Sequence, residues 1–376
     1  MTRVLAVRLD SDGDVLLSGP ALRALAATAE RLDLLASPAG AHAARLLPGV
    51  DDVLVFDPPW SGYAPPPVDP AAVHELVADL AARRYDRAVV LTSFHQSPLP
   101  VALVLRLAGV PFVAGTSEDY PGSLLDLRHR RPDGLHEVQA ALDLATAAGG
   151  RLLDGDDGRL ALRTPLPTLA EALPADALAR ATGGARGSYV VVHPGASVPA
   201  RAPAPDHARA IVAALAEAGR TVLVTGGPRE RDLAARVTAG VAGAVDVAGR
   251  TSLAGLAAVL AGADVVVVGN TGPAHLAAAV GTPVVSLFAP VVPAERWSPW
   301  GVPSVLLGDQ EAPCAGTRAR ECPVAGHPCL SSVAPSRVVA AVEALAVAAA
   351  PAVAPVAGTP TSASTDAPAA PQEVTA

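Results

Sequence analysis

Residues 263–289 read ADVVVVGNTGPAHLAAAVGTPVVSLFA, and this stretch decides the fold. Its first part, residues 263–269, is a short Val-rich run, which predicts a fully buried strand. Residues 273–280 predict a short Ala-rich helix, because proline is favoured in the first turn. Gly281 ends this helix, and residues 283–289 predict the next strand. A strand, a helix and a second strand in this order form the repeating unit of a parallel α/β sheet.

The turn that begins at Asn270, between the first strand and the helix, is suited to hold an anion. Amides at the start of a helix have no acceptor within it, and the helix dipole favours negative charge there. We expect the amides of Thr271, Gly272, Ala274 and His275 to face a ligand, with Gly272 allowing close approach. The same pattern also fits an ordinary connection between a strand and a helix.

The bulk composition bounds the class of protein. With 376 residues the chain is long enough for two domains of ordinary size. Hydrophobic residues make up 51% but aromatic residues only 3%, so we expect a core of Ala, Val and Leu. The net charge of -8 argues against non-specific binding of nucleic acid. All 28 basic residues are Arg, which excludes Schiff-base chemistry on a lysine.

The N-terminal residues 1–10 favour a strand over a signal peptide, because their apolar run is short and soon meets charge. No uninterrupted apolar run reaches the ~20 residues that cross a bilayer. We therefore expect a cytoplasmic protein.

Strand-like and helix-like runs alternate along most of the chain, which predicts an α/β fold with parallel sheets. In the first half, strands are expected at residues 4–7, 31–36, 52–56, 87–92 and 112–114, and helices at 20–30, 70–83, 98–108 and 135–148. In the second half, strands are expected at residues 188–192, 221–225, 245–247, 264–268 and 284–288, and helices at 206–218, 229–239, 253–261 and 337–349.

Stretches rich in Gly, Asp and Pro divide this series into two domains. We expect an N-terminal domain at residues 1–170, a linker at 171–187 and a C-terminal domain at 188–349. Residues 350–376 are Pro, Ala, Thr and Ser with few large apolar side chains, which predicts a disordered tail. Ligands of such sheets bind at the carboxyl ends of the strands.

Three carboxylates, Asp10, Asp12 and Asp14, crowd around Gly13 after the first strand. A carboxylate here is placed to act as a base at an interdomain site. The alternative is helix capping, since Asp is a preferred N-cap. We favour capping for Asp10 and Asp12 and leave both roles open for Asp14.

Two further strand ends carry groups that suit a nucleotide. Ser197 and Arg201 follow the strand that ends before His193, and both side chains contact phosphate well. Gly226 opens the next such turn, and Glu230 is placed to take ribose hydroxyls. The alternatives are a structural histidine and a solvent-exposed glutamate.

The three cysteines, Cys314, Cys322 and Cys329, cluster late in the chain around His327. These are the right ligand types for tetrahedral zinc, but no CxxC pair is present. We favour free thiols in a surface lobe over a metal site.

Taken together, these motifs resemble glycosyltransferase family 9, the heptosyltransferase family. The resemblance rests on residues 8–15 with 20–23, 193–197, and 270–277 with 281–285, and extends to 322–330. It implies a GT-B fold, in which two Rossmann-like domains with parallel sheets face a central cleft. The implied activity is that of an inverting glycosyltransferase that needs no metal or other cofactor.

The resemblance also implies substrates and partners. The donor is a nucleotide-diphospho-sugar, with ADP-heptose favoured, and the acceptor is a saccharide or a lipid-linked glycan. First-domain loops at residues 58–70 and 92–96 are expected to contact the acceptor. We expect a cytoplasmic monomer that binds no nucleic acid and meets the inner membrane face only peripherally. The alternatives are a GT-B-type sugar-nucleotide epimerase or hydrolase, and a non-catalytic nucleotide-sugar-binding protein.

Carried over by motif, Asp14 is the general base. The expected donor-binding residues are Ser197, Arg201, Glu230, Asn270, Thr271, Gly272 and His275, supported by Gly13, His193, Gly195 and Gly226. The family often has Asp where Asn270 stands, and Arg201 lacks the Trp-Pro that usually follows the basic residue.

Overall fold

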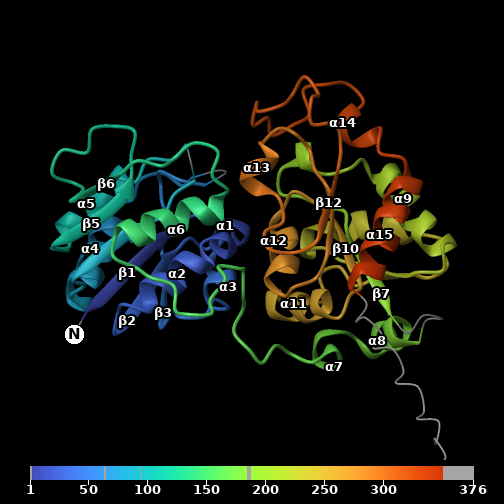
Figure 1. Cartoon of the computed structure of the whole chain (residues 1–376), viewed down its shortest axis with the longest axis horizontal. Coiled ribbons are helices and arrows are strands. Elements are labelled where there is room, and N and C mark those ends of the chain that lie inside the picture. Colours follow the sequence, from blue (N-terminus) through green and yellow to red (C-terminus); the bar gives the residue numbers. More distant parts are fainter. Residues whose placement is uncertain (1, 63–64, 94, 184–187, 350–376) are drawn as a thin grey trace, which may run out of the picture.

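The computed structural model describes residues 2–62, 65–93, 95–183 and 188–349, which form two parallel sheets side by side (Figure 1). Each sheet has 6 strands, in the orders β3-β2-β1-β4-β5-β6 and β12-β11-β10-β7-β8-β9. Within each sheet the first strand therefore lies in the middle, beside the fourth, as in dinucleotide-binding folds. The connection reverses direction between β1 and β4 and between β7 and β10, and ligands of such sheets bind at these points. The predicted α/β class is confirmed.

The strands agree closely with the expected ones. The first sheet contains β1 (Arg3–Arg8), β2 (Arg31–Ala36), β3 (Asp52–Val55), β4 (Arg87–Val90), β5 (Phe112–Thr116) and β6 (Leu127–His129). The second contains β7 (Tyr189–His193), β8 (Thr221–Val224), β9 (Ala244–Asp246), β10 (Val265–Gly269), β11 (Val284–Leu287) and β12 (Ser304–Leu307). The sequence missed β6 and β12 because both are short edge strands without a fully buried apolar run.

Helices cover both sheets. In the first half they are α1 (Asp12–Leu17), α2 (Gly19–Ala26), α3 (Ala41–Ala44), α4 (Pro70–Arg83), α5 (Leu99–Leu107), α6 (Glu137–Ala147), α7 (Leu169–Ala172) and α8 (Ala175–Thr182). In the second they are α9 (Pro205–Glu217), α10 (Arg231–Thr238), α11 (Leu253–Ala261), α12 (Gly272–Ala279), α13 (Ala294–Trp297), α14 (Pro328–Ser331) and α15 (Pro335–Ala349), with short 3-10 turns η1 (Pro199–Arg201) and η2 (Pro228–Glu230).

Two connections are more helical than the sequence indicates. Helix α1 begins at Asp12, so Gly13 lies inside its first turn. Helix α8 occupies much of the stretch 171–187 that we expected to be a linker. Residues 184–187 of that stretch and the expected tail at 350–376 lie outside the described residues.

The core is built from Val, Leu and Ala, as the composition predicts. Val265, Val266, Val267 and Val268 of β10 are all fully buried, since helices cover both faces of the sheet. Each such side chain contributes about 2 kcal/mol through removal from water. None of the described helices is both long and apolar enough to cross a membrane.

The two halves touch through specific contacts on the sides that face each other (Figure 1). His136 caps α6, and its Nε2 donates to the carbonyl of Ser298, 2.9 Å away, in the second half. Trp300 stacks on the His136 ring at 4.7 Å between centroids and donates through Nε1 to the carbonyl of Gly158 at 3.0 Å. These contacts position the carboxyl ends of both sheets relative to each other.

The buried Asp33 of β2 yields a stability prediction. Tyr85 Oη donates to its Oδ2 at 2.7 Å, and Arg31 Nε lies 2.8 Å from Oδ1. Arg83 forms ion pairs with both Asp33 and Asp52. The Asp33 side chain is fully buried, whereas that of Asp52 is 43% exposed. Asp33→Ala is expected to lower the free energy of unfolding by about 1–3 kcal/mol, because the hydroxyl of the buried Tyr85 loses its acceptor.

The matched control is Asp52→Ala, which removes an exposed partner of the same arginine and is expected to cost about 0–1 kcal/mol. Thermal and urea unfolding of both variants checks the difference. Equal losses for the two variants would show that Asp33 is not a stabilising centre of the first sheet.

Candidate active site

The starts of two helices, one from each half, meet at the carboxyl ends of β1 and β10. A Cβ atom added to Gly13 of α1 would lie only 2.9 Å from the Cα of Gly272 in α12. Real Cβ atoms do not approach backbone this closely, so a side chain at Gly13 would push the halves apart. The structure thus brings together the first-half and second-half motifs that the sequence singled out.

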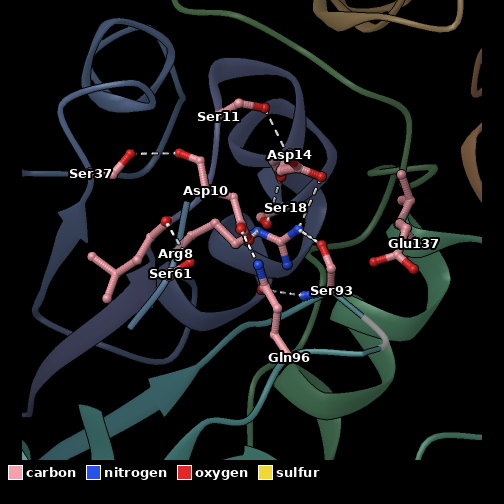
Figure 2. A network of polar contacts seen from close by, with 12 residues as sticks. Arg8, Asp10, Ser11, Asp14, Ser18, Ser37, Ser61, Ser93, Gln96 and Glu137 are labelled. Atoms are coloured by element: carbon pink, nitrogen blue, oxygen red, sulfur yellow. Dashed lines mark hydrogen bonds and ion pairs between the residues drawn. The ribbon is translucent and has the colours of Figure 1, made fainter. Parts of the chain in front are cut away.

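Asp14 extends from the first turn of α1 and is held by a buried arginine (Figure 2). Its Oδ1 lies 3.3 Å from Nη2 of Arg8, and Ser11 Oγ donates to its Oδ2 at 2.9 Å. The Arg8 side chain also donates to Ser93 Oγ at 2.9 Å and pairs with Asp10 at 2.9 Å. Burial alone would lower the pKa of Arg8, but the charges of Asp10 and Asp14 outweigh it and raise that pKa. The Asp14 side chain remains 25% exposed, so a substrate can reach it.

The other two carboxylates of this motif have structural partners, though not as caps of their own helix. Asp10 accepts from Gln96 Nε2 at 2.5 Å, and burial raises its pKa. Asp12 accepts from the amide of Ala43 at 2.9 Å and so caps α3, the neighbouring helix. The N-cap of α1 itself is Ser11. Of the three carboxylates, Asp14 alone combines exposure with a place opposite α12.

At the start of α12, some backbone amides of the turn donate hydrogen bonds to carbonyls of the same turn. The amide of Thr271 donates to the Gly269 carbonyl at 2.8 Å, and that of Ala274 donates to the Thr271 carbonyl at 3.0 Å. These two amides, which we expected to face a ligand, are therefore engaged within the turn. Gly272 is the first helical residue, and its N–H has no acceptor within the helix.

The Asn270 side chain links this turn to Ala289 through two hydrogen bonds. Its Nδ2 donates to the carbonyl of Ala289 at 3.4 Å, and its Oδ1 accepts from the amide of Ala289 at 3.3 Å. Both polar groups of the buried amide are thereby occupied. Asn270 joins the end of β10 to the segment that follows β11.

Two side chains near this turn have buried polar atoms without a hydrogen-bond partner among the described residues. These atoms are Nδ1 of His275, a residue only 5% exposed, and Nε of Arg201. The pKa of His275 is lowered to about 4, mainly by burial and also by the neighbouring His136 and Arg201, against the opposite effect of Asp14. Burial also lowers the pKa of Arg201, against the opposite effect of Asp14. Unpartnered buried donors beside a helix start suit an anionic ligand.

A second polar group surrounds Glu230. His193 Nδ1 lies 3.0 Å from Thr225 Oγ1, its Nε2 lies 3.6 Å from Glu230 Oε2, and burial lowers the pKa of this histidine. The amide of Gly227 donates to Glu230 Oε2 at 2.6 Å. His193 is thus a buried support for Glu230.

The glycines of this group leave room for the Glu230 side chain in its present position. A Cβ on Gly195 would overlap the Glu230 carboxylate, and one on Gly226 would lie 3.1 Å from the Glu230 Cβ. Ser197 lies exposed in the loop before η1.

A cavity of about 220 Å³ opens at the carboxyl end of β4, lined by Leu9, Trp60, His95 and Gln96 among others. Next to it lies a second cavity of about 160 Å³ that shares His95 and Gln96 and includes Arg131. Both adjoin the Arg8 network through Gln96. They include parts of the two loops expected to contact an acceptor, although residues 63–64 and 94 of those loops lie outside the described residues.

The cysteine motif forms no metal site among the described residues, where no group of His, Cys, Asp and Glu is arranged to hold an ion. The three thiols are free. Cys314 and Cys329 are each only 1% exposed, which corrects the expectation of a surface lobe for these two. Burial, together with the nearby Cys314 and Cys322, raises the pKa of Cys329 to about 12.

No role was predicted for Arg8, although it begins the motif at residues 8–15, or for Arg318. Arg8 carried a signal, because it is a charged residue at the end of an otherwise apolar strand. Arg318 carried none, since it lies in an irregular loop far along the chain. Its charge nevertheless acts on both His95 and Arg201.

Known proteins are similar to this chain in sequence and in structure. Lipopolysaccharide heptosyltransferase 1 of Pseudomonas aeruginosa is 41% identical over 115 residues, which are 30% of this chain and 32% of that protein. The match therefore spans about a third of this curated relative's length.

Solved structures match over far more of the chain. E. coli ADP-heptose lps heptosyltransferase II has a TM-score of 0.70 at 20% identity, covering 93% of this chain and 99% of that chain. The iron-containing dodecameric glycosyltransferase TibC from enterotoxigenic E. coli H10407 has a TM-score of 0.51 at 15% identity, covering 92% of this chain and 76% of that chain. With the two parallel sheets, the first of these matches confirms the expected GT-B fold.

The family model for glycosyltransferase family 9 (heptosyltransferase) matches residues 73–327, more than half of the chain. The chain therefore belongs to glycosyltransferase family 9.

Proposed function

We propose that this protein is an inverting, metal-independent glycosyltransferase with Asp14 as its general base. It transfers a heptose-like sugar from a nucleotide-diphospho-sugar, ADP-heptose by preference, to a hydroxyl of a saccharide or lipid-linked acceptor. The observation that carries the proposal is the juxtaposition of α1 and α12. The partly exposed Asp14 lies in the first turn of α1, and Gly13 of the same turn packs closely against Gly272 of α12.

The donor side supplies fixed positive charge. Arg201, the amide of Gly272 and the neutral ring of His275 are placed to hold a diphosphate at the start of α12. Glu230, supported by His193, is placed for the ribose, and the exposed Ser197 completes the phosphate side. Groups that are already oriented stabilise the charge that develops on the leaving diphosphate without a metal ion.

The chemistry on the base side is a single in-line displacement. The acceptor oxygen bonds to the anomeric carbon while the bond from that carbon to the diphosphate oxygen breaks, which inverts the centre. The acceptor proton passes to Asp14, which Arg8 and Ser11 hold in one orientation. The cavities beside Gln96 offer room for the acceptor.

Family membership and the names of relatives support the choice of substrates. The matched relative is a lipopolysaccharide heptosyltransferase, and a structural neighbour is named for ADP-heptose. We propose by extension a cytoplasmic monomer that reaches a lipid-linked acceptor at the inner membrane face, with domain limits at residues 1–170 and 188–349.

The donor site is tested first by calorimetric titration with ADP, GDP and UDP, in the presence of EDTA. One nucleotide, ADP by preference, is expected to bind, and Arg201→Ala is expected to weaken its binding about tenfold or more, since a charge-assisted contact is lost. Gly272→Pro removes the amide and is expected to weaken binding similarly. If no nucleotide binds the wild type, the transferase proposal loses its donor site, and binding only after addition of a divalent metal would contradict metal independence.

The base is tested by Asp14→Asn. This change keeps the shape of the side chain but removes its ability to take a proton, so kcat is expected to fall about 10²–10⁴-fold with nucleotide affinity nearly unchanged. Asp12→Asn is the control, because an amide oxygen still accepts from the amide of Ala43. Near-normal turnover by Asp14→Asn on a verified acceptor would remove Asp14 from the mechanism.

The proposal uses a neutral His275, and this state has a consequence for stability. Burial lowers its pKa to about 4, whereas an unfolded histidine titrates near pH 6.5. Between these values the unfolded chain binds more protons, so the free energy of unfolding falls as pH is lowered from about 6.5 to about 4. His275→Gln is expected to reduce this slope by up to about 1.4 kcal/mol per pH unit.

Unfolding of the wild type and His275→Gln across this pH range measures the two slopes. The exposed His74→Gln is the control for loss of a histidine as such. Identical slopes in all three proteins would show that His275 is not held neutral by the fold.

A further inference from the structure

The segment around Arg318, between β12 and α14, is fastened to one side of the candidate donor site. The amide of Gly316 donates to the carbonyl of Pro290, and the amide of Arg318 donates to that of Val291, each at 2.8 Å. Pro290 and Val291 continue the chain from the residue that the Asn270 side chain binds. The Arg318 backbone is therefore fixed to the turn that begins α12.

The same segment is fastened to the other side as well. The carbonyl of Arg320 accepts from the amide of Ala200 at 2.9 Å. Ala200 directly precedes Arg201, the proposed phosphate ligand, in η1. Arg318 thus sits in a loop that bridges the two segments between which the diphosphate is proposed to bind.

The conformation of Arg318 shows that its place is imposed by the surrounding structure. Its φ is +59°, in the left-handed region that non-glycine residues rarely adopt. Thr317 Oγ1 donates to the carbonyl of Cys314 at 2.7 Å, and Cys314 is buried, which anchors the start of the loop. Such outliers persist where neighbouring contacts determine the backbone and are frequent at ligand sites.

Of the four arginines whose charges act around His95 and Asp14, two are paired with carboxylates, and Asp14 acts on Arg201 without a direct ion pair. Arg8 is balanced by Asp10 and Asp14. Arg131 is balanced by the buried Glu137 at 2.6 Å. Neither of the remaining two arginines, Arg201 and Arg318, forms an ion pair with a described residue.

These two arginines repel each other, because the charge of Arg318 opposes protonation of Arg201. The Arg318 side chain is exposed, so water solvates its charge in the free protein, and a bound anion would offset the repulsion between the two guanidinium groups. The diphosphate of a nucleotide-sugar carries one negative charge on each phosphate, which matches the two cations. It gains a further charge when it leaves.

We propose that Arg318 is a second cationic ligand of the donor diphosphate, bound opposite Arg201. The inference rests on the proposed function and deepens its donor site. Since the charge on the diphosphate grows as its bond to the sugar breaks, Arg318 stabilises the transition state more than the bound donor. Its loss therefore affects kcat more than the KM for the acceptor.

The experiment compares Arg318→Ala, Arg318→Lys and Arg318→Gly in ADP titrations and in turnover. Arg318→Ala is expected to weaken ADP binding about tenfold and to lower kcat about 10²–10³-fold, with the acceptor KM unchanged. Arg318→Lys is expected to recover part of both, because it keeps the charge but loses the bidentate fork. Arg318→Gly relaxes the left-handed backbone, so it is expected to be as impaired as Arg318→Ala while unfolding at an equal or higher temperature.

Arg337→Ala, an exposed arginine on α15, is the matched control and is expected to behave as wild type. A wild type that binds ADP while Arg318→Ala binds it equally well, with unchanged kcat, would overturn the Arg318 proposal alone. A raised acceptor KM with unchanged ADP affinity would also overturn it, by moving Arg318 to an anionic group of the acceptor. Failure of the wild type to bind any nucleotide would instead count against the proposed function.

Discussion

The site depends on the contact between Gly13 and Gly272, where two helices from different sheets begin within van der Waals distance. Each helix start brings a positive dipole end, and the amide of Gly272 has no acceptor within α12, so the contact favours an anion at the boundary of the two halves. The same contact brings the first turn of α1, and with it Asp14, to the start of α12. A side chain at Gly13 would move the proposed base away from the proposed diphosphate site. The small residues here are thus a condition for the proposed catalysis between the sheets.

Buried ion pairs explain why Asp14 differs from its neighbours. Arg8 is surrounded by carboxylates and remains charged despite its burial. Asp10 is fully used by this pair and by Gln96, whereas Asp14 shares the arginine and keeps contact with solvent. The arginine therefore orients a carboxylate that can still meet a substrate. This division of roles follows from position, since the three Asp residues are chemically identical.

A feature of the structure is predictable from the sequence when neighbouring residues determine it, and not when contacts between distant residues do. The Val-rich run of β10 and the glycine after α12 act locally, so the sheet elements and their order were predictable. Which carboxylate caps which helix was not, because Asp12 caps α3 through a residue 31 positions away. The role of Arg318 depends on hydrogen bonds to Val291 and, through Arg320, to Ala200. Pairings at such separation leave no periodic pattern in a single chain.

The departure from the family at Asn270 follows the same logic. An aspartate there would accept from the amide of Ala289 but could not donate to its carbonyl, whereas the asparagine does both. These two hydrogen bonds fix the segment to which the amides of Gly316 and Arg318 donate. Asparagine in place of aspartate also removes a negative charge that would repel the proposed diphosphate and offset the charges of Arg201 and Arg318. The neutral amide thus favours the proposed site, in which the donor supplies the counter-charge.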